Sequence, residues 1–190
     1  MEKSLSDRLQ GINLYLIGMM GAGKTTVGRL IAQALGYQFF DTDAVIEQVT
    51  GQPITALFTE MGEAGFRELE TRVLAELSTY TRLAIATGGG IVLRHENWGY
   101  LRHGVIVWLD VPLEQLQQRL QSDTNRPLLQ TGDLTTRLQT LLDQRRSLYA
   151  QADVHVGYRV GETPTQVAEQ VLIQVQQVLL PDSAPPDYGN

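Results

Sequence analysis

The sequence predicts an α/β domain built on a parallel sheet, and two patterns carry that prediction. Short, nearly continuous apolar runs, typical of strands covered on both faces, alternate with longer segments of helical period. This alternation implies strand–helix–strand units with right-handed crossovers. The chain has 190 residues, of which 43% are hydrophobic, which suits one domain with a substantial core.

The predicted strands are short and rich in apolar residues. They cover 12–17, 37–40, 83–86, 105–110 and 153–156. Apolar residues recur at helical spacing over 24–35, 63–77, 113–120, 134–149 and 165–180. The final stretch, PDSAPPDYGN at 181–190, is rich in proline and polar residues, so we expect a disordered tail after a single domain whose core covers about 12–180.

Composition excludes several classes of protein. The formal net charge of -6 argues against a general nucleic-acid binder, and the lack of cysteine rules out disulfides, thiolate metal sites and a cysteine nucleophile. The first ten residues are polar, and no apolar run approaches the ~18 residues of a membrane span. We therefore expect a cytoplasmic, monomeric protein with neither a nucleic-acid nor a membrane partner.

A phosphate-binding motif lies between the first predicted strand and the first predicted helix. GMMGAGKT, from Gly18 to Thr25, fits G-x-x-x-x-G-K-[ST] in the context that this motif requires. Lys24 is predicted to reach the β- and γ-phosphates, and the Thr25 hydroxyl to ligate Mg²⁺. The backbone N–H groups that would surround the phosphates are those of Gly21, Ala22, Gly23, Lys24, Thr25 and Thr26. The motif alone does not choose among kinases, GTPases and motor ATPases.

Two aspartates follow the second predicted strand in FFDTD. If extended geometry persists, Asp41 and Asp43 point to the same side of the chain, at the sheet edge where ligands bind. We assign Asp41 to the metal, through water, and Asp43 to a substrate hydroxyl that it orients or deprotonates. The alternative is an Asx turn with a helix N-cap at Asp43.

A charged pair and a glycine run supply further candidates. In GEAGFRELE, Arg67 and Glu70 are either a surface ion pair or a braced arginine that binds a substrate carboxylate. TGGG places Gly88, Gly89 and Gly90 directly after a buried strand, where their backbone N–H groups and the space beside them are open to a ligand. No acidic residue ends this strand, which disfavours a motor ATPase and favours a small kinase that uses Asp41.

The downstream arginines are harder to assign. Pro127 bars regular helix, so 122–133 can form a mobile flap that brings Arg126 to the transferring phosphoryl group. Arg119 is either a nucleotide contact or a solvated helix charge. Arg145 and Arg146 are neighbours on a helix and differ by about 100° in direction, so at most one faces the cleft.

In this order, the motifs LIGMMGAGKTTVGR, FFDTD, GEAGFRELE, TGGG, NRPLL and RRSLY resemble those of the shikimate kinase family. The likeness runs from about Asn13 to the last helix. It implies ATP-dependent phosphorylation of the 3-hydroxyl of shikimate, on the route to chorismate and the aromatic amino acids. It also implies a three-layer P-loop kinase fold with a five-stranded parallel sheet in the order 2-3-1-4-5, a lid at about 122–133 and a substrate-binding region at about 43–72.

The resemblance also implies roles for individual residues. Shikimate would be bound by Asp43, Arg67, Gly89 and Arg145, the last of these chosen over Arg146 by the R-x-x-L-Y spacing to Tyr149. The catalytic residues would be Lys24, Asp43 and Arg126, with Arg126 also at the ATP phosphates. Thr25 and Asp41 would hold Mg²⁺.

The sequence departs from the family pattern in two places. Met19 and Met20 stand where aromatic residues are common, and VGYRVGETP matches no clear adenine motif, so Arg159 is only one possible adenine contact beside a surface role. The rival interpretations are a gluconate-type kinase and a nucleotide-binding module without catalysis.

Overall fold

The computed structural model describes residues 4–121, 133–159 and 161–179. Its centre is a five-stranded, all-parallel sheet in the order β2-β3-β1-β4-β5, as the sequence predicted. The strands are β1 (Leu14–Ile17), β2 (Gln38–Asp41), β3 (Leu83–Ala86), β4 (Val105–Asp110) and β5 (Val154–Gly157).

The burial of each strand follows from its place in the sheet. Every residue of β1 and β3 is buried, as expected for apolar runs covered on both faces. The edge strand β5 instead alternates buried and exposed residues. All five carboxyl ends point to the same edge of the sheet, so the loops that follow β1, β2 and β3 meet there.

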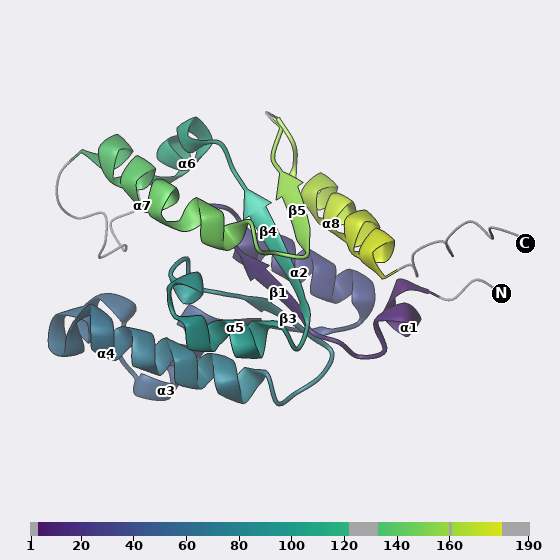
Figure 1. Cartoon of the computed structure of the whole chain (residues 1–190), viewed down its shortest axis with the longest axis horizontal. Helices are drawn as coiled ribbons and strands as arrows, with labels where there is room; N and C mark the ends of the chain where they lie inside the picture. Colours follow the sequence, from purple (N-terminus) through teal and green to yellow (C-terminus); the bar gives the residue numbers. More distant parts are fainter. Residues whose placement is uncertain (1–3, 122–132, 160, 180–190) are drawn as a thin grey trace, which may run out of the picture.

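Helices cover both faces of the sheet and make three layers (Figure 1). Helix α2 (Lys24–Leu35) packs against α8 (Pro164–Val178) on one face, and α4 (Ile54–Leu77), α5 (His95–Leu101) and α7 (Leu134–Tyr149) lie on the other. The remaining helical elements are α1 (Leu5–Leu9), α3 (Thr42–Thr50), η1 (Ile91–Leu93) and α6 (Leu113–Leu120).

The region between β2 and β3 differs most from the predicted elements. The sequence predicted a helix over 63–77, but α4 already begins at Ile54. The missed first segment is separated from the predicted helix by a kink at Gly62, whose φ of 70° and ψ of 178° are not helical. The short helix α3 was also missed. Helix α3 packs against α4, and residues of α3 and of the start of α4 line the cavity beside the loop that follows β1.

Part of the predicted organisation lies outside the described residues. Of the flap predicted at about 122–133, residues 122–132 lie in this part, with Arg126, and so does the tail at 181–190. Within the described residues, no helix combines the length and the apolar character needed to span a membrane.

Candidate functional site

The loop between β1 and α2 has the backbone shape of a phosphate-binding loop. Gly18, Gly21 and Gly23 adopt positive φ angles of 138°, 77° and 89°, which other residues rarely reach. Gly23 is the N-cap of α2 and makes no side-chain cap, so the first N–H groups of this helix face the loop. The helix dipole adds a positive field at the same place, which favours an anion there.

Lys24 is held back onto its own loop. Its Nζ donates hydrogen bonds of 2.8 Å to the carbonyl oxygens of both Gly18 and Met19, and the residue is only 9% exposed. These contacts hold the ammonium group over the loop, within the space that the glycine backbone encloses. A phosphate placed in the loop would therefore meet a cation already in position.

Thr25 and the two aspartates are joined by hydrogen bonds. The Thr25 hydroxyl donates to Asp41 Oδ2 at 2.6 Å, and Asp41 Oδ1 accepts from the backbone N–H groups of Asp43 (3.1 Å) and Ala44 (3.5 Å). The predicted extended geometry was wrong, because Asp41 ends β2 as the N-cap of α3 and Asp43 lies on the first helical turn. The cap is thus Asp41 rather than Asp43.

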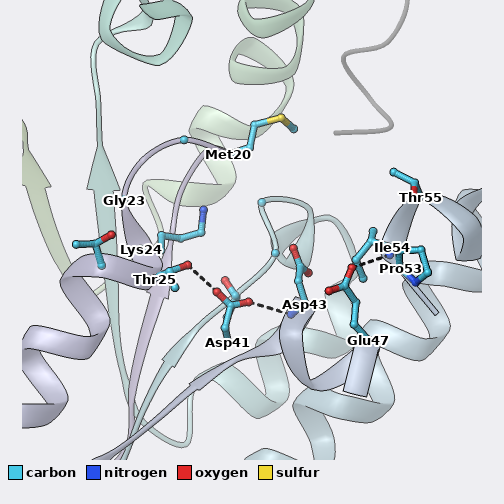
Figure 2. Close-up of a pocket in the computed structure, with 15 residues that line it drawn as sticks. Met20, Gly23, Lys24, Thr25, Asp41, Asp43, Glu47, Pro53, Ile54 and Thr55 are labelled. Carbon is cyan, nitrogen blue, oxygen red and sulfur yellow. Dashed lines mark hydrogen bonds between the residues drawn. The ribbon is translucent and has the colours of Figure 1, made fainter. Parts of the chain in front are cut away.

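A cavity of about 670 Å³ connects these groups (Figure 2). One wall is the phosphate loop, with Lys24 and Thr25, and the opposite wall carries Asp43 and Glu47 of α3. Figure 2 shows the side chains of Lys24 and Asp43 directed into the hollow from opposite sides. At the far end, Glu47 Oε1 accepts a 2.9 Å hydrogen bond from the Ile54 N–H group and so fixes the start of α4.

A smaller pocket of about 60 Å³ opens from the same cavity. Both cavities are lined by Met20, Asp43, Ile54, Gly88 and Gly89, the last two from the loop after β3 (88–90, the glycine loop). A molecule in the small pocket would therefore lie next to Asp43 and face the phosphate loop. Its other lining residues are Phe58, Phe66, Arg67, Glu70 and Arg145. The pocket thus combines an aromatic wall with two arginines, which suits a small apolar ring that carries a carboxylate.

Arg67 is buried rather than a surface ion-pair residue. Its Nη1 donates to Glu70 Oε2 at 2.9 Å and its Nη2 to Glu63 Oε1 at 3.1 Å, while Nε has no hydrogen-bond partner among the described residues. Burial lowers the pKa of the guanidinium, but the neighbouring charges of Glu70 and Glu63 outweigh it and raise the pKa overall. Arg67 is therefore a permanent cation in a fixed orientation.

Glu70 is the buried anchor of this arginine. It is fully buried, and burial raises the pKa of its carboxyl, although the Arg67 guanidinium acts in the opposite direction. Buried ion pairs contribute little net stability because desolvation offsets their attraction. We therefore attribute the pair to the positioning of Arg67 rather than to folding.

Each glycine of the loop after β3 is in close contact with another site residue. A side chain on Gly88 would overlap the Glu70 carboxylate, and one on Gly90 would overlap the Arg67 guanidinium. A Cβ on Gly89 would lie 3.3 Å from the backbone nitrogen of Met20 and 3.6 Å from Arg145 Nη1. The loop thus fits between the two arginines and the phosphate loop.

The two consecutive arginines of α7 have opposite environments. Arg145 is 2% exposed and lines the small pocket, and its Nε and Nη1 have no hydrogen-bond partner within the described residues. Arg146 is exposed and lies 4.0 Å from Asp110. Buried guanidinium donors of this kind are stabilised when an anion enters and accepts from them.

A third cavity of about 270 Å³ lies on the other side of the phosphate loop. It is lined by Gly21, Gly23, Thr26, Val27, Arg119, Tyr158, Glu162 and Pro164. The Arg119 guanidinium lies 5.1 Å from the centre of the Tyr158 ring and donates to the Gly21 carbonyl at 3.0 Å. A flat guanidinium beside an aromatic ring, next to a phosphate loop, suits a nucleobase.

Sequence reasoning missed Tyr158 and weighed Arg159 in its place. Arg159 does not line this cavity, and its backbone N–H group donates to Glu162. Tyr158 directly follows the carboxyl end of β5, and an aromatic residue at that sheet edge is the signal that could have identified it. Arg126 lies outside the described residues, so the structure does not relate it to the site.

Comparison with known proteins agrees with this geometry. The family model for shikimate kinase matches residues 20–176. The shikimate kinase of Nostoc punctiforme is 56% identical over 180 residues, which cover 95% of this chain and 99% of that protein. The shikimate kinase of a second Nostoc strain is 57% identical over 175 residues, which cover 92% of this chain and 97% of that protein.

Solved structures give the same result. Shikimate kinase from Acinetobacter baumannii, solved in complex with shikimate, superposes with a TM-score of 0.87 at 39% identity, over 92% of this chain and 98% of that one. A gluconokinase from Sinorhizobium meliloti matches with a TM-score of 0.57 at 18% identity, over 89% of this chain and 94% of that one, which shows a shared fold alone. The family match over residues 20–176 and the identity to the Nostoc enzymes together establish that this chain belongs to the shikimate kinase family.

Proposed function

We propose that this kinase transfers the γ-phosphoryl group of ATP to the 3-hydroxyl of shikimate, giving shikimate 3-phosphate and ADP. One observation carries the proposal: the pocket of two buried arginines opens into the phosphate-loop cavity, and Asp43 lines both. An acceptor that carries a carboxylate and a hydroxyl would then be held with the hydroxyl toward the donor. Family membership supports the same reaction.

In the acceptor half, Arg67 and Arg145 are assigned to the carboxylate. Both present a buried nitrogen that has no hydrogen-bond partner among the described residues, and charge-assisted bonds to a carboxylate are among the stronger hydrogen bonds. Gly89 supplies a backbone wall without a side chain, and Phe58 and Phe66 face the ring. We assign α3 and α4 up to about residue 72 as the substrate-binding region.

In the donor half, the N–H groups from Gly21 to Thr26 are assigned to the phosphates and Lys24 to the β- and γ-oxygens. The cavity beside Arg119 and Tyr158 is assigned to the nucleobase, since it adjoins the loop at Gly21 and Gly23. Arg126, in the segment assigned as the lid, would stabilise the charge of the transferring phosphoryl group. We propose that the monomer is the functional unit.

Thr25 and Asp41 fit a magnesium ion held with ATP. The Thr25 hydroxyl donates a hydrogen bond to Asp41, so the lone pairs of the Thr25 oxygen can bind a cation. Asp41 can bind the same ion through water. Magnesium would neutralise charge on the β- and γ-phosphates. Two oxygen donors are enough from the protein, because Mg²⁺ keeps several waters and takes phosphate oxygens as further ligands.

Asp43 is assigned to the reacting hydroxyl. Its place across the cavity from Lys24 lets it accept the hydroxyl's hydrogen bond and receive the proton as the oxygen bonds to phosphorus and the bond to ADP breaks. A loose phosphoryl-transfer transition state needs little more than positioning and charge neutralisation, so the reaction does not demand a strong base at this position.

The test is ADP release, coupled to NADH oxidation, with purified protein, ATP and Mg²⁺. We expect turnover with shikimate and little with gluconate or nucleoside monophosphates. Folding is checked by thermal unfolding in the same buffer. If folded protein released no ADP in response to shikimate, the proposal would be wrong, and turnover with gluconate instead would identify the rival kinase.

A further inference from the structure

Tyr149 is a buried tyrosine that the reaction itself leaves without a role. It ends α7 one turn after Arg145 and is 0% exposed. Its ring stacks on Trp108, with ring centres 5.9 Å apart and planes inclined by 27°. Packing alone would be served equally well by phenylalanine, so the hydroxyl needs a separate explanation.

The Tyr149 hydroxyl binds the glycine loop of the acceptor pocket. It donates a 2.5 Å hydrogen bond to the carbonyl oxygen of Gly89 and lies 3.7 Å from the sulfur of Met19 in the phosphate loop. Burial raises the pKa of this hydroxyl to about 12, although the charge of Arg145 beside it acts in the opposite direction. The group therefore stays protonated, and remains a donor, throughout the range in which enzymes work.

The glycine loop needs such an external restraint. Three consecutive glycines have more backbone freedom than any other sequence and no side chains to anchor them. Backbone N–H groups of η1 bind the carbonyls of Gly88 and Gly90 but leave that of Gly89. Two hydroxyls from outside the loop add to these bonds: the buried Thr42 accepts from the Gly88 N–H group at 3.0 Å, and Tyr149 donates to the Gly89 carbonyl. Because the peptide is planar, fixing the Gly89 carbonyl also fixes the direction of the Gly90 N–H group.

The same hydrogen bond ties the helix that carries Arg145 to the loop that Arg145 contacts. Arg145 Nη1 lies 3.6 Å from the position of a Cβ on Gly89, and α7 also packs against η1, directly after the loop. We propose that Tyr149 is a positioning residue for the acceptor: its hydroxyl joins α7 to the glycine loop and so sets the place of Arg145 against Gly89. The proposal rests on the proposed function, because it assigns Arg145 to the shikimate carboxylate.

The test compares Tyr149→Phe with the wild type. Phenylalanine keeps the ring on Trp108 and removes only the donor, so we expect the shikimate KM to rise about 10-fold while the ATP KM stays within about twofold. The matched control is Tyr15→Phe, since Tyr15 is also fully buried but its ring lies beside Gly104, before β4 and away from the site. This control should leave both constants unchanged.

An uncharged acceptor distinguishes a specific effect on the position of Arg145 from a general loosening of the acceptor pocket. Shikimamide replaces the carboxylate with an uncharged amide and gains less from Arg145, so the Tyr149→Phe effect on its KM should shrink to about threefold or less. Equal effects on both acceptors, or a matching rise in the ATP KM, would overturn the proposal. An unchanged shikimate KM would overturn it as well.

Two further measurements keep the outcome decisive. If Tyr149→Phe does not fold, 4-aminophenylalanine at position 149 provides a variant that keeps a hydrogen-bond donor. A shikimate KM near the wild-type value in this variant would support the proposal. A rise in that KM of about 10-fold would contradict it. Wild-type protein that neither binds nor phosphorylates shikimate would instead refute the proposed function. The two failures are therefore distinguishable.

Discussion

The phosphate-binding part of the donor half is one continuous stretch from Gly18 to Thr26, whereas the acceptor half takes its residues from α3, α4, α7 and the glycine loop. As we assign it, this part would bind phosphates mainly through backbone N–H groups at the N-terminus of α2, with Lys24 as the added cation. The acceptor half uses buried charged side chains, Arg67, Glu70 and Arg145, each packed against a glycine or an aromatic ring.

This difference indicates what each half can discriminate. Backbone groups around a phosphate bind the part that all nucleoside triphosphates share, so the same loop serves many enzymes. Buried guanidinium groups are costly unless an anion of the right shape accepts from them, so we expect them to disfavour acceptors that lack a carboxylate. Specificity in this protein should therefore lie in the acceptor half, and rate in the donor half.

The largest expected effect comes from Lys24→Ala in the donor half. The lysine is assigned to the charge that develops on the transferring phosphoryl group, so its loss should lower kcat by about 10³-fold, with a much smaller change in the shikimate KM. Steady-state ADP release measures both constants. The control is Arg29→Ala, which removes an exposed cation from the same helix. A variant that kept a tenth of the wild-type kcat would show that catalysis does not depend on this cation.

Arg67→Ala should have the converse effect, on binding rather than on rate. We expect the shikimate KM to rise about 100-fold and the ATP KM to change little, because one of the two guanidinium groups assigned to the carboxylate is lost. The variant also leaves Glu70 buried without its partner, which should lower the free energy of unfolding by about 3 kcal/mol. Kinetics should therefore be measured well below the midpoint of thermal unfolding.

Arg72→Ala is the matched control, since Arg72 is exposed on the same helix. It should change neither the shikimate KM nor the stability by a measurable amount. If Arg67→Ala left the shikimate KM unchanged, the carboxylate assignment would be wrong, and specificity would have to come from another part of the acceptor pocket.

The same contrast explains which features of the fold and the site could be predicted from the sequence. The strands of the parallel sheet follow from apolar runs and the phosphate loop from one contiguous motif, so both could be predicted, whereas the strand order was implied only by the family resemblance. The placement of Asp41 and Asp43 could not, because the Asp41 side chain caps α3 and turns the chain directly after β2. Helix α3 contains the β-branched residues Val45, Ile46 and Val49, which gave no clear helical signal.

Tertiary contacts decide the remaining features. Whether Arg67 and Glu70 are exposed or buried depends on packing against Phe58, beyond the kink at Gly62, and no local pattern encodes that contact. Tyr158 was missed because base stacking needs only an aromatic ring at the right strand end, without a motif around it. The acceptor half was recognisable only because several weak motifs occur together in one order.

Gly90→Ala gives the smallest of these effects and tests the packing of the acceptor half most directly. Gly90 has φ −96° and ψ 1°, which alanine can adopt, so the backbone does not require glycine there. The new methyl group would instead overlap the Arg67 guanidinium, which must shift from its place between Glu70 and Glu63. We expect the shikimate KM to rise about 10-fold, with kcat nearly unchanged.

Gly99→Ala provides the control, because a Cβ there meets nothing within 4 Å and the residue lies inside helix α5. It should leave the shikimate KM unchanged and raise the free energy of unfolding by up to about 1 kcal/mol. Combining Gly90→Ala with Arg67→Ala should add almost nothing to the effect of Arg67→Ala alone, since both act through one guanidinium. Additive effects would mean that Gly90 contacts the acceptor directly. In that case, the methyl group of Gly90→Ala would not act by displacing the Arg67 guanidinium.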